Sequence, residues 1–393
     1  MKMKVHEPVC IAQGPTYEEV SWGPWQFPGL REDEHGNIYA SIGISEDNES
    51  ARENDSAWFI SRDRGETWEQ TTPENAAVGY TLMPNGDRLE SFPSKLYQIP
   101  EEAYKDAEPL EVLHDWCDIY VYNKEDIKPG YIGDKFRFWR VKAGETERKI
   151  DYGTISGYDK QVVTRTINGF SDPYLFGRMR VAPDGSVWHT DYGRERNQVT
   201  GKYHPGFTAL YFRSTDYGKS WKLESTIEPP PLDSPNYNYY CEPDIAWLDE
   251  KTAVTVNRGS FCSYAVSHDG GFTWDEPKYF DSIGVYPAIA ALKCGAVLVS
   301  YGRPGFLLRA SLDGKCETWE EPVELIGRYD HASEMNEPCA PGGGHSWGTC
   351  SYSDIVVLND NEALVVYTDF FRPDEKGIKR KSLMVVKVSF EEE

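Results

Sequence analysis

One short pattern occurs four times along this chain of 393 residues, and it constrains the fold more than any other feature. It begins with Ser, has Asp two residues later, continues through Gly, and ends in Thr-Trp or Ser-Trp. The copies span residues 61–68, 214–221, 267–274 and 311–319, the last with one additional residue. Asp bonds backbone N–H groups across tight turns, Gly accepts positive φ, and Trp buries itself against a neighbouring unit. Each copy therefore predicts a hairpin turn.

Each copy also occupies the same place in a larger unit. A strand-like apolar run precedes it, and the unit opens with an apolar strand, a turn and a second strand. The opening turns lie at residues 35–37, 84–87, 183–185, 249–251, 293–295 and 359–361. Six units follow from this spacing, two of them without the pattern, and the second carries an insertion at about residues 95–131.

Six four-stranded antiparallel units that close in a ring form a six-bladed β-propeller. We therefore predict an all-β fold with a single domain over residues 1–393. Residues 9–12 are expected to supply the outer strand of the last blade. A β-sandwich with coincidental turn similarity is disfavoured, because turn spacing and pattern position agree along the whole chain.

Charge and composition exclude several classes of protein. The chain has 41 Lys and Arg against 64 Asp and Glu, a net charge of −23, which argues against a nucleic-acid partner. No apolar run of about 18 residues is present, so no membrane helix is predicted. Residues 1–8 lack the apolar segment of a signal peptide, and the eight cysteines are scattered. We expect a cytoplasmic protein with reduced thiols, although a secreted chain trimmed of its signal has the same appearance.

With its four turn patterns the chain resembles the sialidase superfamily of glycoside hydrolases, whose repeats, the Asp boxes, lie on a six-bladed propeller. The resemblance covers almost the whole chain. It is specific for the fold and says little about chemistry, because these turns lie at the periphery. The family's site contains three arginines that hold a substrate carboxylate, a Tyr nucleophile with a Glu partner, and an Asp acid/base.

Several residues match this set of catalytic groups. Glu242 opens the fourth blade, and Arg258 ends the second strand of that blade, as the family's Glu and second arginine do. Tyr352 opens the sixth blade in a Tyr-Ser strand, so the resemblance implies that it is the nucleophile. Arg303, which ends the second strand of the fifth blade, matches the third arginine.

The first arginine is the clearest departure from the family. The family opens blade one with Arg-Ile-Pro, whereas this chain has Gln26-Phe27-Pro28. A neutral amide in place of a bidentate cation weakens the case for a sialic-acid carboxylate. Arg194, at the end of a blade-three strand, and Arg178, at the entrance to that blade, are candidates to replace it.

The acid/base is expected just before the third strand of blade one. Asp55 is our choice, and Asp47 and Glu49 in the same loop are alternatives. A carboxylic acid there protonates the leaving oxygen of a glycoside.

A polar loop precedes the sixth blade and is expected on the same face as Tyr352. Its candidates for lining a sugar pocket are His331, Glu334, Glu337, His345 and Trp347, with Trp347 as a stacking platform. The spacing of these His and Glu residues matches no established metal site, so neither a metal nor another cofactor is predicted. Residues 114–116 of the insertion either cap the pocket or contact another subunit.

Three functions fit these residues. The first is a retaining exo-glycosidase acting on a terminal acidic or related sugar of a glycan. The second is a polysaccharide lyase that removes a proton beside a uronic carboxylate, and the third is a carbohydrate-binding propeller without catalysis. All three take a carbohydrate partner; neither the sugar and its linkage nor the oligomeric state follows from the sequence.

Overall fold

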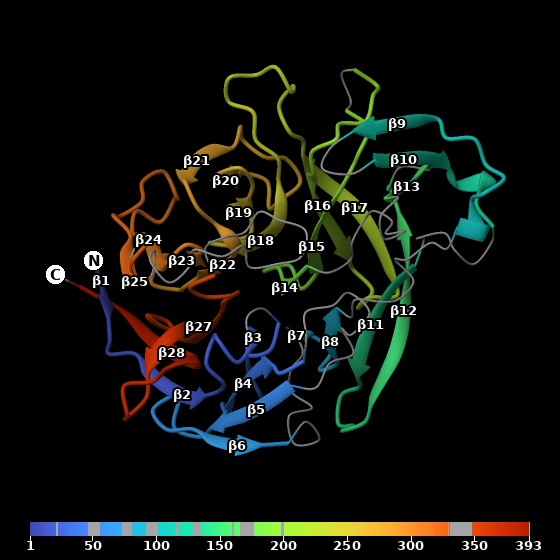
Figure 1. The fold of residues 1–393 in the computed structure, drawn as a ribbon. Coiled ribbons are helices and arrows are strands. Elements are labelled where there is room, and N and C mark those ends of the chain that lie inside the picture. The colour runs from blue at the N-terminus through green and yellow to red at the C-terminus, as the bar shows by residue number, and fades with distance from the viewer. Residues whose placement is uncertain are drawn as a thin grey trace. The chain divides into compact units, whose positions relative to one another are not determined.

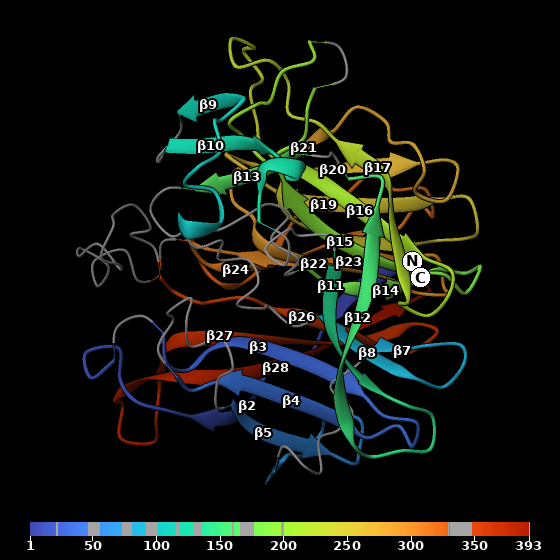
Figure 2. The same ribbon diagram turned by 90° about the vertical axis from the view of Figure 1, so that its right-hand side faces the viewer.

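The computed structural model describes twelve stretches of the chain, traced in Figures 1 and 2. They are residues 1–20, 23–45, 56–72, 81–91, 101–114, 118–128, 135–158, 161–165, 177–197, 200–328, 330 and 348–392. The chain divides into two compact units, and each is described by itself. Unit 1 comprises Met1–Gly79, Ala246–Leu248 and Asp281–Glu393, and unit 2 comprises Tyr80–Ile245 and Asp249–Phe280. The single-domain organisation stays a prediction.

Unit 1 contains three antiparallel sheets. The first is β3 (Gln26–Glu32), β4 (Ile38–Gly43), β5 (Ser56–Ser61) and β6 (Glu69–Thr71). The second is β22 (Val285–Ala291), β23 (Val297–Gly302), β24 (Phe306–Ser311) and β25 (Val323–Ile326). The third is β26 (Asp354–Asn359), β27 (Glu362–Pro373) and β28 (Lys379–Glu391), with β1 (Lys2–Val5) and β2 (Val9–Gln13) both paired to β28.

The N-terminal strand closes the third sheet as the sequence predicts. Residues Val9 and Cys10 of β2 pair with Val385 and Met384 of β28. Strand β1, which the sequence analysis did not identify, pairs with the other end of β28, with Val5 opposite Val388. The two chain termini therefore belong to one sheet, and Figure 1 shows them side by side.

Unit 2 contains the remaining strands. Four-stranded groups form from β7 (Thr81–Leu82), β8 (Arg88–Ser91), β11 (Lys135–Val141) and β12 (Arg148–Ser156), and from β14 (Met179–Val181), β15 (Val187–Gly193), β16 (Thr208–Ser214) and β17 (Ser220–Ile227). These two groups join through a parallel pairing of β12 with β17. A further sheet is formed by β18 (Cys241–Trp247), β19 (Ala253–Arg258), β20 (Cys262–Ser267) and β21 (Lys278–Asp281). The last two residues of β18 and the last residue of β21 belong to unit 1.

The insertion forms structure of its own. It contains the short 3-10 helices η2 (Glu101–Ala103) and η3 (Lys124–Asp126) and the strands β9 (Glu111–His114) and β10 (Asp118–Asn123). Strand β10 also pairs with β13 (Gln161–Arg165), which lies well beyond the predicted end of the insertion. The described chain is thus all-β, built largely from antiparallel four-stranded sheets of the kind that form propeller blades.

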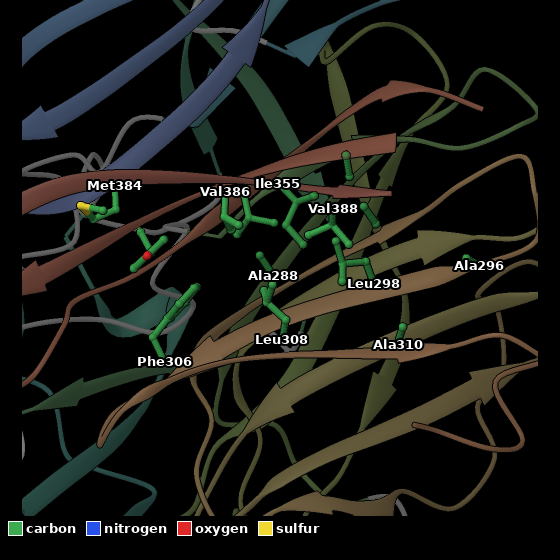
Figure 3. Close-up of a cluster of buried hydrophobic side chains, with 14 of the residues drawn as sticks. Ala288, Ala296, Leu298, Phe306, Leu308, Ala310, Ile355, Met384, Val386 and Val388 are labelled. Carbon is green, nitrogen blue, oxygen red and sulfur yellow. The ribbon is translucent and has the colours of Figure 1, made fainter. Parts of the chain in front are cut away.

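Alternating residues of β28 bury themselves in two different cores. Met384, Val386 and Val388 contribute to one cluster with β22–β24, shown in Figure 3. Leu383 and Val385 contribute to another with β3–β5. Successive side chains of a strand point to opposite faces, so a strand with continuous apolar sequence is buried on both faces. This explains the continuous apolar run Leu383–Val386 in the last strand.

Each of the four repeated turns has the same pattern of hydrogen bonds. In the first copy Asp63 accepts bonds from Ser61 Oγ at 2.8 Å and from the Thr67 N–H at 2.9 Å, and the Gly65 N–H donates to Ser61 Oγ. Asp216, Asp269 and Asp313 bind the matching residues of the other copies. Gly65 has φ +92° and lies so close to Leu364 of a neighbouring sheet that a Cβ there would approach it to 2.8 Å. These turns are therefore structural, as the sequence predicts.

Two further observations concern membrane-spanning helices and the cysteines. Within the stretches described, no helix is long and apolar enough to cross a membrane. Six of the eight cysteines lie in those stretches, and each is a free thiol.

Candidate functional site

Two strands in different units begin with the same short motif. Glu242-Pro243-Asp244-Ile245 opens β18, and Tyr352-Ser353-Asp354-Ile355 leads into β26. In both, the aspartate folds back onto the backbone. Asp244 Oδ1 accepts the Ile245 N–H at 3.0 Å, and Asp354 Oδ1 accepts the Ile355 N–H at 3.0 Å. The two segments therefore share the Asp-Ile step and its hydrogen bond, while only Glu242 has a positive φ.

Each aspartate also binds an arginine from a different strand, β14 for Asp244 and β3 for Asp354. Arg180 of β14 donates to both carboxylate oxygens of Asp244, at 3.0 and 2.8 Å. Arg31 of β3 donates to Asp354, which also accepts the Leu30 N–H at 3.3 Å. The Arg180 contact is bidentate and the Arg31 contact is made through one nitrogen, and charge-assisted hydrogen bonds of both kinds fix geometry well. The backbone two residues earlier, at Glu242 and Tyr352, is thereby held in place.

Glu242 carries a buried charge that Arg258 compensates. Its side chain is only 6% exposed, and Arg258 Nη1 lies 3.0 Å from both carboxylate oxygens. A buried carboxylate is stable only when it is paired in this way. The preceding Cys241 is also buried, and burial raises its pKa far above the usual value despite the opposing charge of Arg258. This thiol stays protonated at neutral pH.

Two aromatic rings lie against Tyr352. Its ring stacks on Tyr286 of β22, with centroids 4.1 Å apart and planes 13° apart. The ring of Phe27 from β3 meets it edge-on at 4.9 Å. The Phe27 N–H donates to Ser351 Oγ at 3.0 Å, which ties β3 to the residue before Tyr352. All three rings are partly exposed.

The backbone at three strand starts is strained in the same way. Phe27, Glu242 and Tyr286 are each the second residue of a strand, each precedes a proline, and their φ values are +58°, +47° and +44°. Positive φ costs roughly 1–3 kcal/mol for a residue other than glycine and concentrates at functional sites. The pairing register of β3 and of β22 also shifts at this step. This strained step positions the second side chain of each of the three strands.

Arg303 follows the end of β23, as expected, and lies near the start of the Tyr352 motif. Its φ is +63°, and its N–H donates to the Gly305 carbonyl at 2.9 Å. The same carbonyl accepts from Cys350 Sγ at 3.2 Å. Burial raises the pKa of Cys350 to about 11, and the positive charge of Arg303 partly opposes this rise. Arg303 is thus close to Cys350, two residues before Tyr352.

The candidates for a replacement arginine have different surroundings. Arg194 is fully buried; its Nε donates to the Pro205 carbonyl at 2.9 Å, and its guanidinium lies 4.3 Å from the ring of Phe207. Arg178 Nη1 lies 3.4 Å from Asp244 Oδ2. Both side chains thus contribute to the internal structure of unit 2. Their roles as substrate ligands stay predictions.

Gln26 is buried with an unsatisfied amide. Its exposed fraction is 0%, and neither Nε2 nor Oε1 has a hydrogen-bond partner in the described structure. Most buried polar groups have one, so an unsatisfied amide beside a candidate site needs an explanation.

Several predicted residues lie outside the described stretches. They are Asp47, Glu49, Asp55, Asp115, Trp116, His331, Glu334, Glu337, His345 and Trp347. Their roles stay predictions. His114 at the end of β9 is described; it is exposed, with Nδ1 2.7 Å from Asp118. Among the side chains that are described, no three or more His, Cys, Asp and Glu gather as metal ligands.

Sequence reasoning missed Phe27 and Tyr286 as neighbours of Tyr352. One signal was available, because an aromatic residue or Glu precedes proline at three strand starts: Phe27-Pro28, Glu242-Pro243 and Tyr286-Pro287. The arginines that hold the two motif aspartates, Arg31 and Arg180, were also missed. Nothing in their local sequence distinguishes them from solvated arginines.

Comparisons with known proteins show the fold. No family model matches the chain, and no curated protein matches its sequence. A protein of unknown function from Dyadobacter fermentans is 14% identical, with a TM-score of 0.61 and 99% of each chain covered. A mutant of the NanB sialidase from Streptococcus pneumoniae is 12% identical, with a TM-score of 0.53, covering 96% of this chain and 70% of that one.

A second kind of glycosidase is similar as well. The GH93 alpha-L-arabinofuranosidase of Fusarium graminearum, in complex with arabinobiose, is 10% identical, with a TM-score of 0.50 and 97% of each chain covered. The chain therefore shares a sialidase-like glycosidase fold with these enzymes. At such identities the likeness is one of architecture, and chemistry has to be argued from the site.

Proposed function

We propose that this protein is a glycoside hydrolase that releases a terminal sugar with retention of anomeric configuration. The observation that carries the proposal is the matched pair of strand starts. An aspartate-anchored strand start presents a carboxylate at Glu242 and another presents a phenol at Tyr352. In the proposed reaction the phenol is the nucleophile and the carboxylate is its base. The glycosidase fold of the chain supports the same reaction class.

The mechanism assigns one task to each group. A phenol has a pKa of about 10 and attacks poorly at neutral pH, so Glu242 takes the Tyr352 proton as the oxygen bonds to the anomeric carbon. Asp55, with Asp47 and Glu49 as alternatives, gives a proton to the departing glycosidic oxygen. Water then attacks the glycosyl-tyrosine; the same acid, now a base, takes a proton from that water, and the tyrosine leaves with the proton held by Glu242.

The proposal includes the complete architecture. We assign six blades: β3–β6; β7, β8, β11 and β12; β14–β17; β18–β21; β22–β25; and β26–β28 with β1 and β2. The four repeated turns are assigned as Asp boxes on the sheets that carry β5, β16, β20 and β24. The substrate is a glycan.

Turnover of fluorogenic glycosides tests the proposal. The full chain is assayed against a panel of neutral and acidic 4-methylumbelliferyl glycosides, and proton NMR follows the anomer first released. We expect cleavage with retention, loss of activity in Tyr352→Phe, and full activity in Tyr279→Phe, an exposed tyrosine of unit 2. Release of the inverted anomer, or unchanged activity of Tyr352→Phe, contradicts the mechanism.

Two other outcomes identify other functions. A product that absorbs in the near ultraviolet, formed from a uronic-acid polysaccharide, identifies a lyase. Binding without any cleavage identifies a carbohydrate-binding propeller. The aromatic rings around Tyr352, one stacked on it and one edge-on, favour the binding propeller as the second candidate, because aromatic faces bind sugars without chemistry.

A further inference from the structure

Two buried serines flank Tyr352, and each is bonded to a buried hydroxyl from another strand. The Ser351 N–H donates to Thr368 Oγ1 at 2.7 Å, and the hydroxyls of these two residues lie 3.0 Å apart. On the other side, Ser353 Oγ lies 2.8 Å from Ser300 Oγ. All four of these residues are at most 3% exposed. The chain is therefore held by a buried hydroxyl immediately before and immediately after Tyr352.

Thr368 lies at a core position of β27. It is opposite Leu383 of β28 and two residues after Val366, and both of these belong to the core cluster that β28 shares with β3–β5. Residues directly opposite each other, and residues two apart on one strand, point to the same face of a sheet. Thr368 is itself fully buried, so its hydroxyl stands on a face whose neighbouring side chains are apolar.

Ser300 lies at a similar position in a different core. It is opposite Ala288 of β22 and Leu308 of β24, which both belong to the cluster in Figure 3, and it is fully buried as well. A buried hydroxyl is destabilising unless it is hydrogen-bonded, whereas an apolar side chain has no such requirement. Packing alone therefore does not account for a hydroxyl at either position. Both hydroxyls make their contacts with the residues beside Tyr352.

We propose that Thr368 and Ser300 are positioning residues for Tyr352. They fix the backbone on both sides of this residue, and thereby the place of its phenol oxygen. Attack on an anomeric carbon needs that oxygen at one place, since a displacement of about 1 Å can lower a rate about 10²-fold. Both residues are fully buried, so they act through Tyr352 and not on the sugar. The inference rests on the proposed function, because it takes Tyr352 as the nucleophile.

Two substitutions of Thr368 separate positioning from packing. Thr368→Val keeps the shape of the side chain and removes the hydroxyl, whereas Thr368→Ser keeps the hydroxyl and removes a methyl group. We expect kcat to fall about thirtyfold in Thr368→Val with KM unchanged, and to stay within about threefold of the parent in Thr368→Ser. A role in packing alone predicts the reverse order, because Ser leaves a cavity and Val does not. Steady-state turnover of the glycoside identified in the panel measures both variants.

A second measurement does not depend on turnover. A single 3-fluorotyrosine is introduced at position 352 of the full chain, and its fluorine NMR resonance reports the surroundings of that ring. We expect Thr368→Val and Ser300→Ala to shift or split the resonance, and Thr368→Ser to leave it as in the parent. Ser389→Ala is the matched control, because Ser389 is also buried and its hydroxyl bonds His6 in the same sheet as Thr368. Thermal unfolding shows that each variant is folded.

The outcomes separate the positioning role from the reaction. A parent-like kcat in Thr368→Val, an equal fall in Thr368→Ser, or an unchanged resonance in both Thr368→Val and Ser300→Ala overturns the positioning role. If these variants match the parent while Tyr352→Phe is inactive, the proposed function stands and the positioning role is wrong. If the resonance responds as expected and no glycoside is cleaved, the two hydroxyls do position Tyr352 and the proposed function is wrong.

Discussion

The strand starts at Glu242 and Tyr352 share an aspartate anchor and differ in the chemistry around the residue they present. In both, an aspartate two residues later binds its own backbone and an arginine from another first strand. At Glu242 the side chain meets the charged Arg258; at Tyr352 it meets the aromatic faces of Tyr286 and Phe27. The difference shows that the motif fixes the backbone, while the neighbouring strands decide the chemistry of the residue that it presents.

The strongest test of this comparison removes the hydroxyl from the aromatic side. Tyr352→Phe keeps the stacked ring and loses only the oxygen, so the fold should be unchanged. We expect kcat to fall by about 10³-fold or more, because no other described group provides the nucleophile. Steady-state turnover of the glycoside identified in the panel measures this. A fall of less than tenfold would place the nucleophile elsewhere.

The corresponding change on the charged side is Glu242→Gln. It removes the base and leaves Arg258 facing a neutral amide. We expect kcat to fall by about 10²–10⁴-fold, the usual range for loss of a general base. The double variant with Tyr352→Phe should be no slower than the slower single variant, because both changes affect one step. Multiplication of the two single effects would show that the residues act independently.

The anchors of the two motifs should differ in their contribution to stability. Asp244 is fully buried and lies against two arginines, Arg180 and the buried Arg178, so Asp244→Ala removes the carboxylate that both of them contact and should cost about 3–5 kcal/mol. Asp354 binds the partly exposed Arg31, and Asp354→Ala should cost about 1–3 kcal/mol. Urea unfolding of both variants gives the two values. Equal losses would mean that the buried Arg178 beside Asp244 does not contribute.

The smallest effect concerns the repeated turns, which both units share. Hydrogen bonds from the Thr67 hydroxyl and N–H lower the pKa of Asp63 from 3.8 to about 2. At Asp313 burial acts in the opposite direction, but bonds from Thr318 and Lys315 outweigh it and also bring the pKa to about 2. The folded pKa is below the unfolded one, so this stability is present above about pH 4 and is lost as the pH falls towards 2.

Substitution of one turn aspartate should flatten that pH dependence. Because Asp63 is largely exposed, Asp63→Asn should change the free energy of unfolding between pH 4 and pH 2.5 by less than about 1 kcal/mol. Urea unfolding at pH 6, 4 and 2.5 compares the variant with the parent chain. A variant that loses more stability at low pH than the parent would reverse the expected sign.

Much of the fold follows from local sequence. The repeated turns are predictable because Ser61, Asp63, Gly65 and Thr67 satisfy one another within a few residues. The pairing of the N-terminal segment with the last strand followed from its apolar sequence and the need to complete a sheet. Strand β13 was not predictable, because its pairing with β10 joins segments far apart in the sequence.

The site was predictable only in part. Glu242, Tyr352 and Arg258 were chosen because their strand starts and strand end resemble those of the sialidase family, and their roles stay predictions. Their partners depend on which strands lie side by side, and a single sequence does not state this. Tyr286 and Phe27 reach Tyr352 from β22 and β3, and no periodicity within either strand indicates that contact.

Covalent trapping tests the central claim most directly. The full chain is incubated with 2-fluoroglycosyl fluorides of neutral sugars and with 2,3-difluorosialic acid, and intact mass and peptide mapping locate any adduct. We predict a single glycosyl adduct on Tyr352, formed with one of these reagents and absent from Tyr352→Phe. An adduct on another residue, or none with any reagent while the glycoside is still turned over, would contradict the assignment of Tyr352 as the nucleophile.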